Sequence, residues 1–129
     1  MADEDASFPF RDLVGFTVET HADRATAVVE VGPQHLNPHG VLHGGVAFTL
    51  IDTAMGAAAQ AAVDDGLWCT TIDIHTRFLR PVTAGRLTAH ATVRRRGRRV
   101  VHVDGVLSDG DGVEYVSAVG TFAVIVPGT

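Results

Sequence analysis

The sequence is poor in several residue types, and each shortage narrows what the protein can be. Cys69 is the only cysteine, so no disulfide can form within the chain and the disulfide framework of a small secreted domain is excluded. Lysine is absent, and all ten basic residues are arginines. The net charge of −5 argues against general binding to nucleic acids or membranes.

The first residues, MADEDAS, lack the basic and apolar regions of a signal peptide. We expect residues 1–7 to form a mobile acidic tail and residues 8–129 to form a single domain, in a cytoplasmic protein. A domain of this length buries roughly two-thirds of its unfolded surface. The hydrophobic fraction of 46% excludes a disordered chain.

The longest apolar stretch runs from Val46 to Val63, and its only ionisable residue is Asp52. A helix that is apolar on all sides is buried in a core or spans a membrane. The length approaches that of a transmembrane helix, but the many small residues and the central carboxylate favour a buried helix. An isolated carboxylate in such a helix costs free energy unless partners hold it, so Asp52 calls for a functional explanation.

Alternating apolar and polar residues predict six strands, two before this helix and four after it. The turns between the last four strands are short enough for an antiparallel meander. Prolines and glycine make residues 32–42 a loop. This order of elements predicts an α+β fold, and the expected strand ranges are 14–20, 24–31, 68–79, 86–95, 98–108 and 113–126.

Two segments carry a specific resemblance. The run NPHGVLHGGVAFTLIDTAMG, from Asn37 to Gly56, resembles the active-site segment of hotdog-fold acyl-CoA thioesterases, and most of all the phenylacetate-pathway thioesterase-like family. The run TIDIHTRFLRPV, from Thr71 to Val82, is similar to that family's third strand and turn. The resemblance implies the hotdog fold, an antiparallel sheet of about six strands wrapped around one long central helix.

The same resemblance implies catalytic roles for five residues. Asp52 matches the acidic residue that acts as a base on water or as a nucleophile on the thioester carbonyl. Gly44 matches the residue whose backbone N–H, at the helix N-terminus, polarises that carbonyl as an oxyanion hole does. Asn37 and His43 match polar positions that orient the thioester or the water, and Thr71 matches a hydroxyl residue that helps to place the water.

Helix geometry indicates that one chain cannot complete this site. Gly44 and Asp52 are eight residues apart, which on a straight helix is a rise of about 12 Å. An aspartate side chain is too short to meet a carbonyl group held at the N-terminus of its own helix. A two-fold axis that sets a second helix antiparallel alongside would give two equivalent composite sites. We therefore expect a homodimer at least, and the resemblance implies further pairing into a homotetramer.

Further residues are candidates for binding acyl-CoA. Five arginines lie between residues 94 and 99, and this segment, called the arginine hairpin below, is either a solvated turn or a docking patch for coenzyme A phosphates. Apolar residues such as Phe48, Leu50 and Met55 are expected to line the acyl pocket. The candidate substrate-binding residues are Gly45, Arg80, Arg95, Arg96 and Arg98.

Each of these residues also has a simpler interpretation. Asp52 could anchor a hydrogen-bond network in the core, and the glycine pair could only permit close packing. His43 could be a core histidine, and Asn37 an ordinary turn residue. Cys69 is expected to be a small buried side chain rather than a nucleophile.

Two functional alternatives and a metal site fit the residues less well than hydrolysis does. The segment LNPHG resembles the NPxH segment of hotdog enoyl-CoA hydratases, but His35 stands where that motif carries an aspartate. A non-catalytic acyl-CoA-binding protein on the same fold has no need of Asp52. Three histidines recur at intervals of four residues from His35, but Pro38 and Gly40 break the helix that would align them. We therefore expect no metal and no other cofactor.

Overall fold

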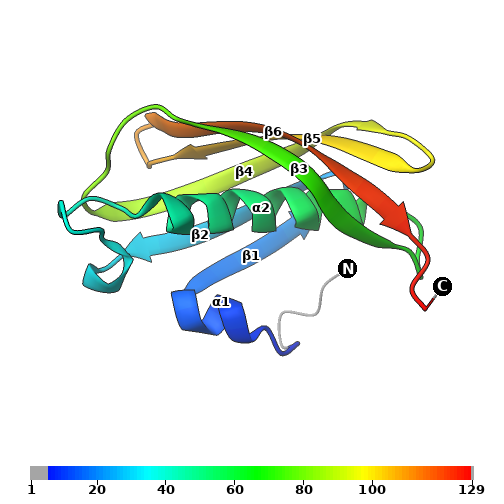
Figure 1. The fold of residues 1–129 in the computed structure, drawn as a ribbon, viewed down its shortest axis with the longest axis horizontal. Coiled ribbons are helices and arrows are strands. Elements are labelled where there is room, and N and C mark those ends of the chain that lie inside the picture. The colour runs from blue at the N-terminus through cyan, green and yellow to red at the C-terminus, as the bar shows by residue number, and fades with distance from the viewer. Residues whose placement is uncertain (1–5, 129) are drawn as a thin grey trace.

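The computed structural model describes residues 6–128, which form a six-stranded antiparallel sheet with one long helix against it (Figure 1). The six strands and the helix that the sequence predicts are confirmed. Of the predicted tail, residues 1–5 lie outside the described part. The elements are α1 (Pro9–Val14), β1 (Phe16–His21), β2 (Arg24–Val31), a 3-10 turn (Pro33–His35), α2 (Gly44–Ala61), β3 (Trp68–Phe78), β4 (Gly85–Arg96), β5 (Val100–Ser108) and β6 (Glu114–Ile125).

The short helix α1 differs from the sequence prediction, in which a strand begins at residue 14. Pro9 supplies a fixed φ at the first helical position. Gly15 ends the helix in the left-handed region, at φ 85°, and donates its N–H to the Arg11 carbonyl at 2.7 Å. These local signals outweigh the strand pattern, so β1 starts only at Phe16.

Helix α2 begins with a side-chain cap. His43 accepts the Gly45 N–H through Nδ1 at 2.8 Å, which satisfies one of the free N–H groups at the helix start. The buried face of α2 packs on the sheet, and its fully buried residues are Ala47, Leu50, Ile51, Ala54, Met55, Ala58 and Ala59. No helix formed by residues 6–128 has both the length and the apolarity needed to cross a membrane.

The strand order corrects the predicted meander. The sheet runs β1-β2-β4-β5-β6-β3, so β3 pairs with β6 and β4 pairs with β2. The link from β3 to β4 therefore crosses three strand spacings, about 14 Å. Residues 79–84 can span that gap, since six extended residues reach about 20 Å. A short connection between strands was thus mistaken for a hairpin turn.

The two edges of the sheet, β1 and β3, lie on opposite sides of α2 (Figure 1). β3 is mostly exposed and has a bulge between Thr71 and Asp73. Trp68, Ile72 and Phe78 each expose more than half of their surface along it. An open edge with large apolar side chains is a surface on which another strand can pair.

Candidate active site

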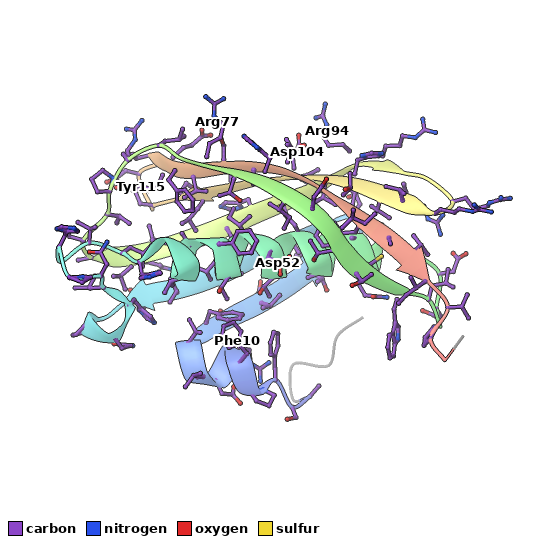
Figure 2. All side chains as sticks on the ribbon, viewed as in Figure 1. Phe10, Asp52, Arg77, Arg94, Asp104 and Tyr115 are labelled. Atoms are coloured by element: carbon purple, nitrogen blue, oxygen red, sulfur yellow. The ribbon has the colours of Figure 1, made fainter. Side chains whose placement is uncertain are left out.

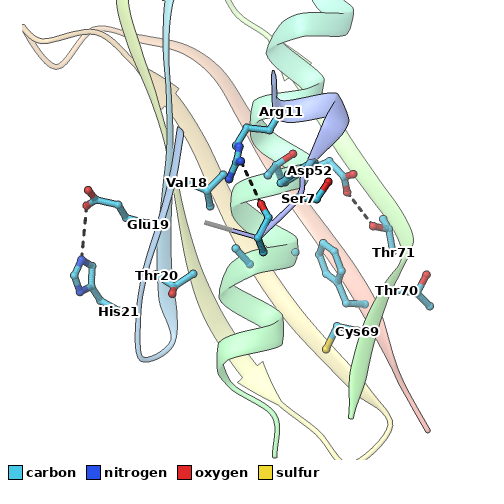
Figure 3. Close-up of a pocket in the computed structure, with 16 residues that line it drawn as sticks. Ser7, Arg11, Val18, Glu19, Thr20, His21, Asp52, Cys69, Thr70 and Thr71 are labelled. Atoms are coloured by element: carbon cyan, nitrogen blue, oxygen red, sulfur yellow. Dashed lines mark hydrogen bonds and ion pairs between the residues drawn. The ribbon is translucent and has the colours of Figure 1, made fainter. Parts of the chain in front are cut away.

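Asp52 lies on α2 outside the face that packs in the core, and it is half-buried (Figure 2). Thr71, on β3, donates its hydroxyl to Asp52 Oδ1 at 2.9 Å (Figure 3). Among residues 6–128, no donor bonds the other carboxylate oxygen. The structure therefore brings these two predicted residues together and leaves one oxygen of Asp52 available for chemistry.

A cavity of about 840 Å³ opens beside Asp52. It lies beside α2, between residues of β1 and β3, and residues of the N-terminal segment also line it (Figure 3). Its volume falls within the range of small-molecule sites. The lining residues are Ala6, Ser7, Phe8, Arg11, Val18, Glu19, Thr20, His21, Asp52, Thr53, Gly56, Ala57, Cys69, Thr70, Thr71 and Phe122.

This lining differs from the predicted one. Leu50 and Met55 are fully buried against the sheet, and Phe48 is exposed, so none of the three lines the cavity. The apolar character of Leu50 and Met55 marks the core face of α2 rather than a pocket. Ala6 and Ser7 belong to the predicted tail, yet they line the cavity.

The N-terminus of α2 holds a second cluster of predicted residues. The Gly45 N–H is taken up by His43, whereas nothing in the described part of the chain accepts the Gly44 N–H. A Cβ atom on Gly44 would lie 3.3 Å from the Phe78 ring, so Phe78 flanks this position. Of the two glycines, only Gly44 keeps a backbone donor for a ligand. His43 is exposed and is thus not a core histidine.

The loop before α2 is fixed by its own side chains. Asn37 Oδ1 accepts the His39 N–H at 2.9 Å and the Val41 N–H at 3.4 Å, so its oxygen shapes the turn. Its amide nitrogen has no acceptor among residues 6–128 and is left for a ligand. Asn37 therefore fits both of the interpretations offered for it.

His35 is buried beneath the same loop, with both ring nitrogens engaged. Nδ1 accepts the Gly32 N–H at 2.9 Å, and Nε2 therefore carries the proton and donates to the Val14 carbonyl at 2.7 Å. The side chain joins the loop to the end of α1, and it cannot serve as the catalytic acid of a hydratase. No three metal-binding side chains gather anywhere in residues 6–128.

The predicted catalytic residues thus form two clusters. Asp52 and Thr71 line the cavity, whereas Asn37, His43 and Gly44 do not. The two clusters are separated along α2, because Gly44 and Asp52 are eight positions apart, about 12 Å of rise. One chain supplies both halves of the predicted site without joining them.

The candidate arginines lie at opposite ends of α2. A bulge between Val93 and Arg95 shifts the register of β4, and Arg96 then donates from Nε to the Ala62 carbonyl, just past the C-terminus of α2, at 3.4 Å. Arg95 and Arg98 stay exposed. The arginine hairpin therefore lies at the C-terminal end of α2.

Arg80 lies at the other end of α2. Its segment touches the start of the helix twice, because the Leu42 N–H bonds the Val82 carbonyl at 2.8 Å and Phe78 flanks Gly44. Arg80 is exposed and is close enough to influence the Tyr115 hydroxyl. Its segment therefore lies at the end of α2 where Gly44 is, away from the arginine hairpin.

Cys69 lines the cavity and is half-buried. Burial raises the pKa of its thiol, and the nearby positive charge of Arg96 offsets part of that rise. A thiol with a raised pKa is a weak nucleophile at neutral pH. Cys69 is thus less buried than the sequence predicts, and its raised pKa does not favour a nucleophilic role.

Comparison with known proteins identifies the family. The model of the thioesterase superfamily matches residues 39–116. A thioesterase structure from Haemophilus influenzae is similar with a TM-score of 0.87 at 26% identity, over 93% of this chain and 85% of that one. A mutant thioesterase from Pseudomonas aeruginosa gives a TM-score of 0.83 at 31% identity, over 90% of this chain and 85% of that one.

The Escherichia coli PaaI protein, from the phenylacetic acid degradation operon, gives a TM-score of 0.82 at 29% identity, over 90% of this chain and 83% of PaaI. PaaI is named an acyl-coenzyme A thioesterase, and its sequence is 41% identical over 76 residues, which span 58% of this chain and 52% of PaaI. The hotdog fold expected from the sequence is confirmed. The chain belongs to the thioesterase superfamily and is a thioester hydrolase of the hotdog fold.

Proposed function

We propose that the protein hydrolyses the thioester of an acyl-CoA to the free acid and coenzyme A. The observation that carries this proposal is the half-buried Asp52 carboxylate, bonded on one oxygen by Thr71 and facing a cavity of ligand size. The similarity to PaaI supports acyl-CoA as the substrate class. Water is the only co-substrate, and no metal or redox cofactor takes part.

Two routes use the same residues. Asp52 takes a proton from a water molecule whose oxygen adds to the carbonyl carbon, or its carboxylate adds there directly and forms an anhydride that water then cleaves. In both, the Gly44 N–H donates to the carbonyl oxygen as it gains negative charge. In both, the carbon–sulfur bond breaks when the tetrahedral adduct collapses, and coenzyme A leaves as a thiolate that picks up a proton. On the direct route this step forms the anhydride, and water cleaves it afterwards. His43 and the Asn37 amide orient the thioester or the water.

We propose further that each site is shared by two chains. Thr71 bonds Asp52 and Phe78 flanks Gly44, so the two clusters are attached to the two halves of β3. If two β3 strands pair antiparallel about a point between these residues, Asp52 of one chain approaches Gly44 of the other. The open, apolar edge of β3 supports this pairing. The dimer would have two equivalent sites, and two dimers would form the tetramer.

In this arrangement Arg80 of the second chain would lie beside Gly44 at the shared site. Its guanidinium is our first candidate for binding coenzyme A phosphates. The arginine hairpin is a second candidate. The effects on KM of variants at Arg80 and in the arginine hairpin decide between the two.

The test is hydrolysis of a panel of acyl-CoAs by the purified protein, followed through the thiol released. We expect turnover for at least one aryl or medium-chain substrate, and a loss of about 100-fold or more in kcat for Asp52→Asn, because the amide neither takes up a proton nor attacks carbon. The variant's circular dichroism and Tm serve as the folding control. A folded Asp52→Asn protein with nearly unchanged kcat would remove Asp52 from the mechanism.

A further inference from the structure

The cavity beside Asp52 extends in one direction only along α2. On the helix its lining consists of Asp52, Thr53, Gly56 and Ala57, and no residue of α2 nearer the N-terminus takes part. Gly56 is one turn beyond Asp52, about 6 Å along the axis. A group attached to a carbonyl carbon at Asp52 and placed in this cavity must therefore pass Gly56.

Neither packing within the chain nor backbone conformation explains a glycine at position 56. Its φ is not positive, and it lies inside an 18-residue helix, where glycine is less stable than alanine. A Cβ atom there would meet only the Phe122 ring, at 3.6 Å, which is an ordinary van der Waals contact. Alanine would fit the fold and stabilise the helix.

Two other glycines show what a packing requirement looks like. A Cβ atom on Gly105 would lie 2.9 Å from Met55 Sδ, and one on Gly120 would lie 2.9 Å from Met55 Cε. Both glycines therefore make room for a core side chain of α2. At Gly56 the space freed by the missing side chain belongs instead to the cavity, in front of Phe122.

We propose that Gly56 determines the size of the acyl group, which lies in the cavity between Asp52 and Phe122. This inference rests on the proposed function. The cavity is too large to be filled by an acetyl group, and Phe8, Val18 and Phe122 give it apolar walls. The preferred substrates are therefore thioesters of aryl acids or medium-chain fatty acids. Coenzyme A then leaves on the side of Gly44, where we place Arg80.

The wall formed by the N-terminal segment is anchored by aromatic contacts. Phe8 meets Phe16 edge to face, with ring centroids 5.7 Å apart, and the Arg11 guanidinium lies 5.5 Å from the centre of the Phe8 ring. Residues of α1 itself are not buried. Phe8 is thus the side chain by which this segment closes the cavity, and removing its ring should enlarge the space.

The experiment measures kcat/KM for acetyl-, hexanoyl-, decanoyl- and benzoyl-CoA in three variants. For Gly56→Ala we expect a rise in Tm of a few degrees, together with a loss of roughly 10-fold or more for decanoyl- and benzoyl-CoA relative to acetyl-CoA. Phe8→Ala should shift the profile toward decanoyl-CoA. Gly110→Ala is the matched control, because a Cβ atom there meets nothing within 4 Å, and its profile should not change.

Three results would overturn the inference. An unchanged profile in Gly56→Ala would show that the acyl group lies elsewhere. An equal loss for all four substrates would place the pantetheine arm in the cavity instead. Dissociation of the dimer, measured by size-exclusion chromatography with light scattering, would show that Gly56 serves contact between helices.

Binding of free decanoic acid, measured by calorimetry, separates this inference from the proposed function. If the protein hydrolyses no acyl-CoA, the proposed function fails. Tight binding of decanoic acid to the unmodified protein, weakened roughly 10-fold in Gly56→Ala, would then still support the role of Gly56. Equal binding to both proteins would refute it.

Discussion

The hydrogen bond from Thr71 to Asp52 allows a quantitative test of how the carboxylate works. Thr71→Val removes the hydroxyl that lies 2.9 Å from Asp52 Oδ1 and keeps the shape of the side chain. A hydrogen bond to a charged group contributes about 1.5–3 kcal/mol, which corresponds to about 10- to 150-fold in rate. Because Thr71 is exposed, we expect the lower end, about 10-fold in kcat.

A double-mutant cycle shows whether Thr71 acts through Asp52. If Thr71 only positions the carboxylate, adding Thr71→Val to Asp52→Asn should lower kcat by less than about 3-fold. The losses in kcat of the two single variants then do not multiply. Thr71→Ser keeps a hydroxyl and should restore most of the activity. The assay is steady-state hydrolysis of the best acyl-CoA, with Tm as the folding control. Losses that multiply fully would mean that Thr71 contacts the water or the substrate independently.

The remaining predictions concern the shared site, the arginines and the cysteine. When Asp52→Asn protein is refolded with an equal amount of inactive Asn37→Ala protein, about a quarter of the unmodified activity should return. Half of the dimers would then be mixed, and each mixed dimer would hold one intact site. If mixed dimers are shown to form and no activity returns, the shared site is refuted. Arg80→Gln should raise KM for acyl-CoA several-fold with little change in kcat. If KM rises instead when exposed arginines of the arginine hairpin are neutralised, the hairpin binds the coenzyme A phosphates. Burial raises the pKa of Cys69, so alkylation of its thiol by iodoacetamide should reach half its maximal rate at a higher pH than alkylation of a free cysteine does. Mass spectrometry follows the reaction, and decanoic acid should slow it. A pH profile equal to that of a free cysteine contradicts the burial.

The fold was predictable to the extent that its signals are local. Alternation along β2 gave its bounds, 24–31, as observed, and the uncharged run around Asp52 predicted α2. The pairing of β3 with β6 was not predictable in this way. Six residues can make a turn or cross three strand spacings, and their sequence does not decide between the two.

The candidate site was predictable residue by residue but not as a cavity. The motif around Asp52 and the resemblance named the residues that the structure places in two clusters. The cavity wall at Ala6, Ser7 and Phe8 was missed, because nothing in the sequence ties that segment to α2. Gly56 lies within the motif from Asn37 to Gly56. Its role can be inferred only from the structure, which gives the distance between Phe122 and a Cβ atom placed on Gly56.

The strand order also has a consequence for how the protein is made. Within residues 6–128, β3 pairs only with β6, Trp68 opposite Ile125, so β3 leaves the ribosome long before its partner strand exists. Until then both of its edges are free to pair wrongly with another chain. β2 is likewise synthesised well before its partner β4, because α2 and β3 lie between them in the sequence. Contacts so distant in sequence make folding slow, and the sheet therefore closes around α2 only after β6 has been synthesised.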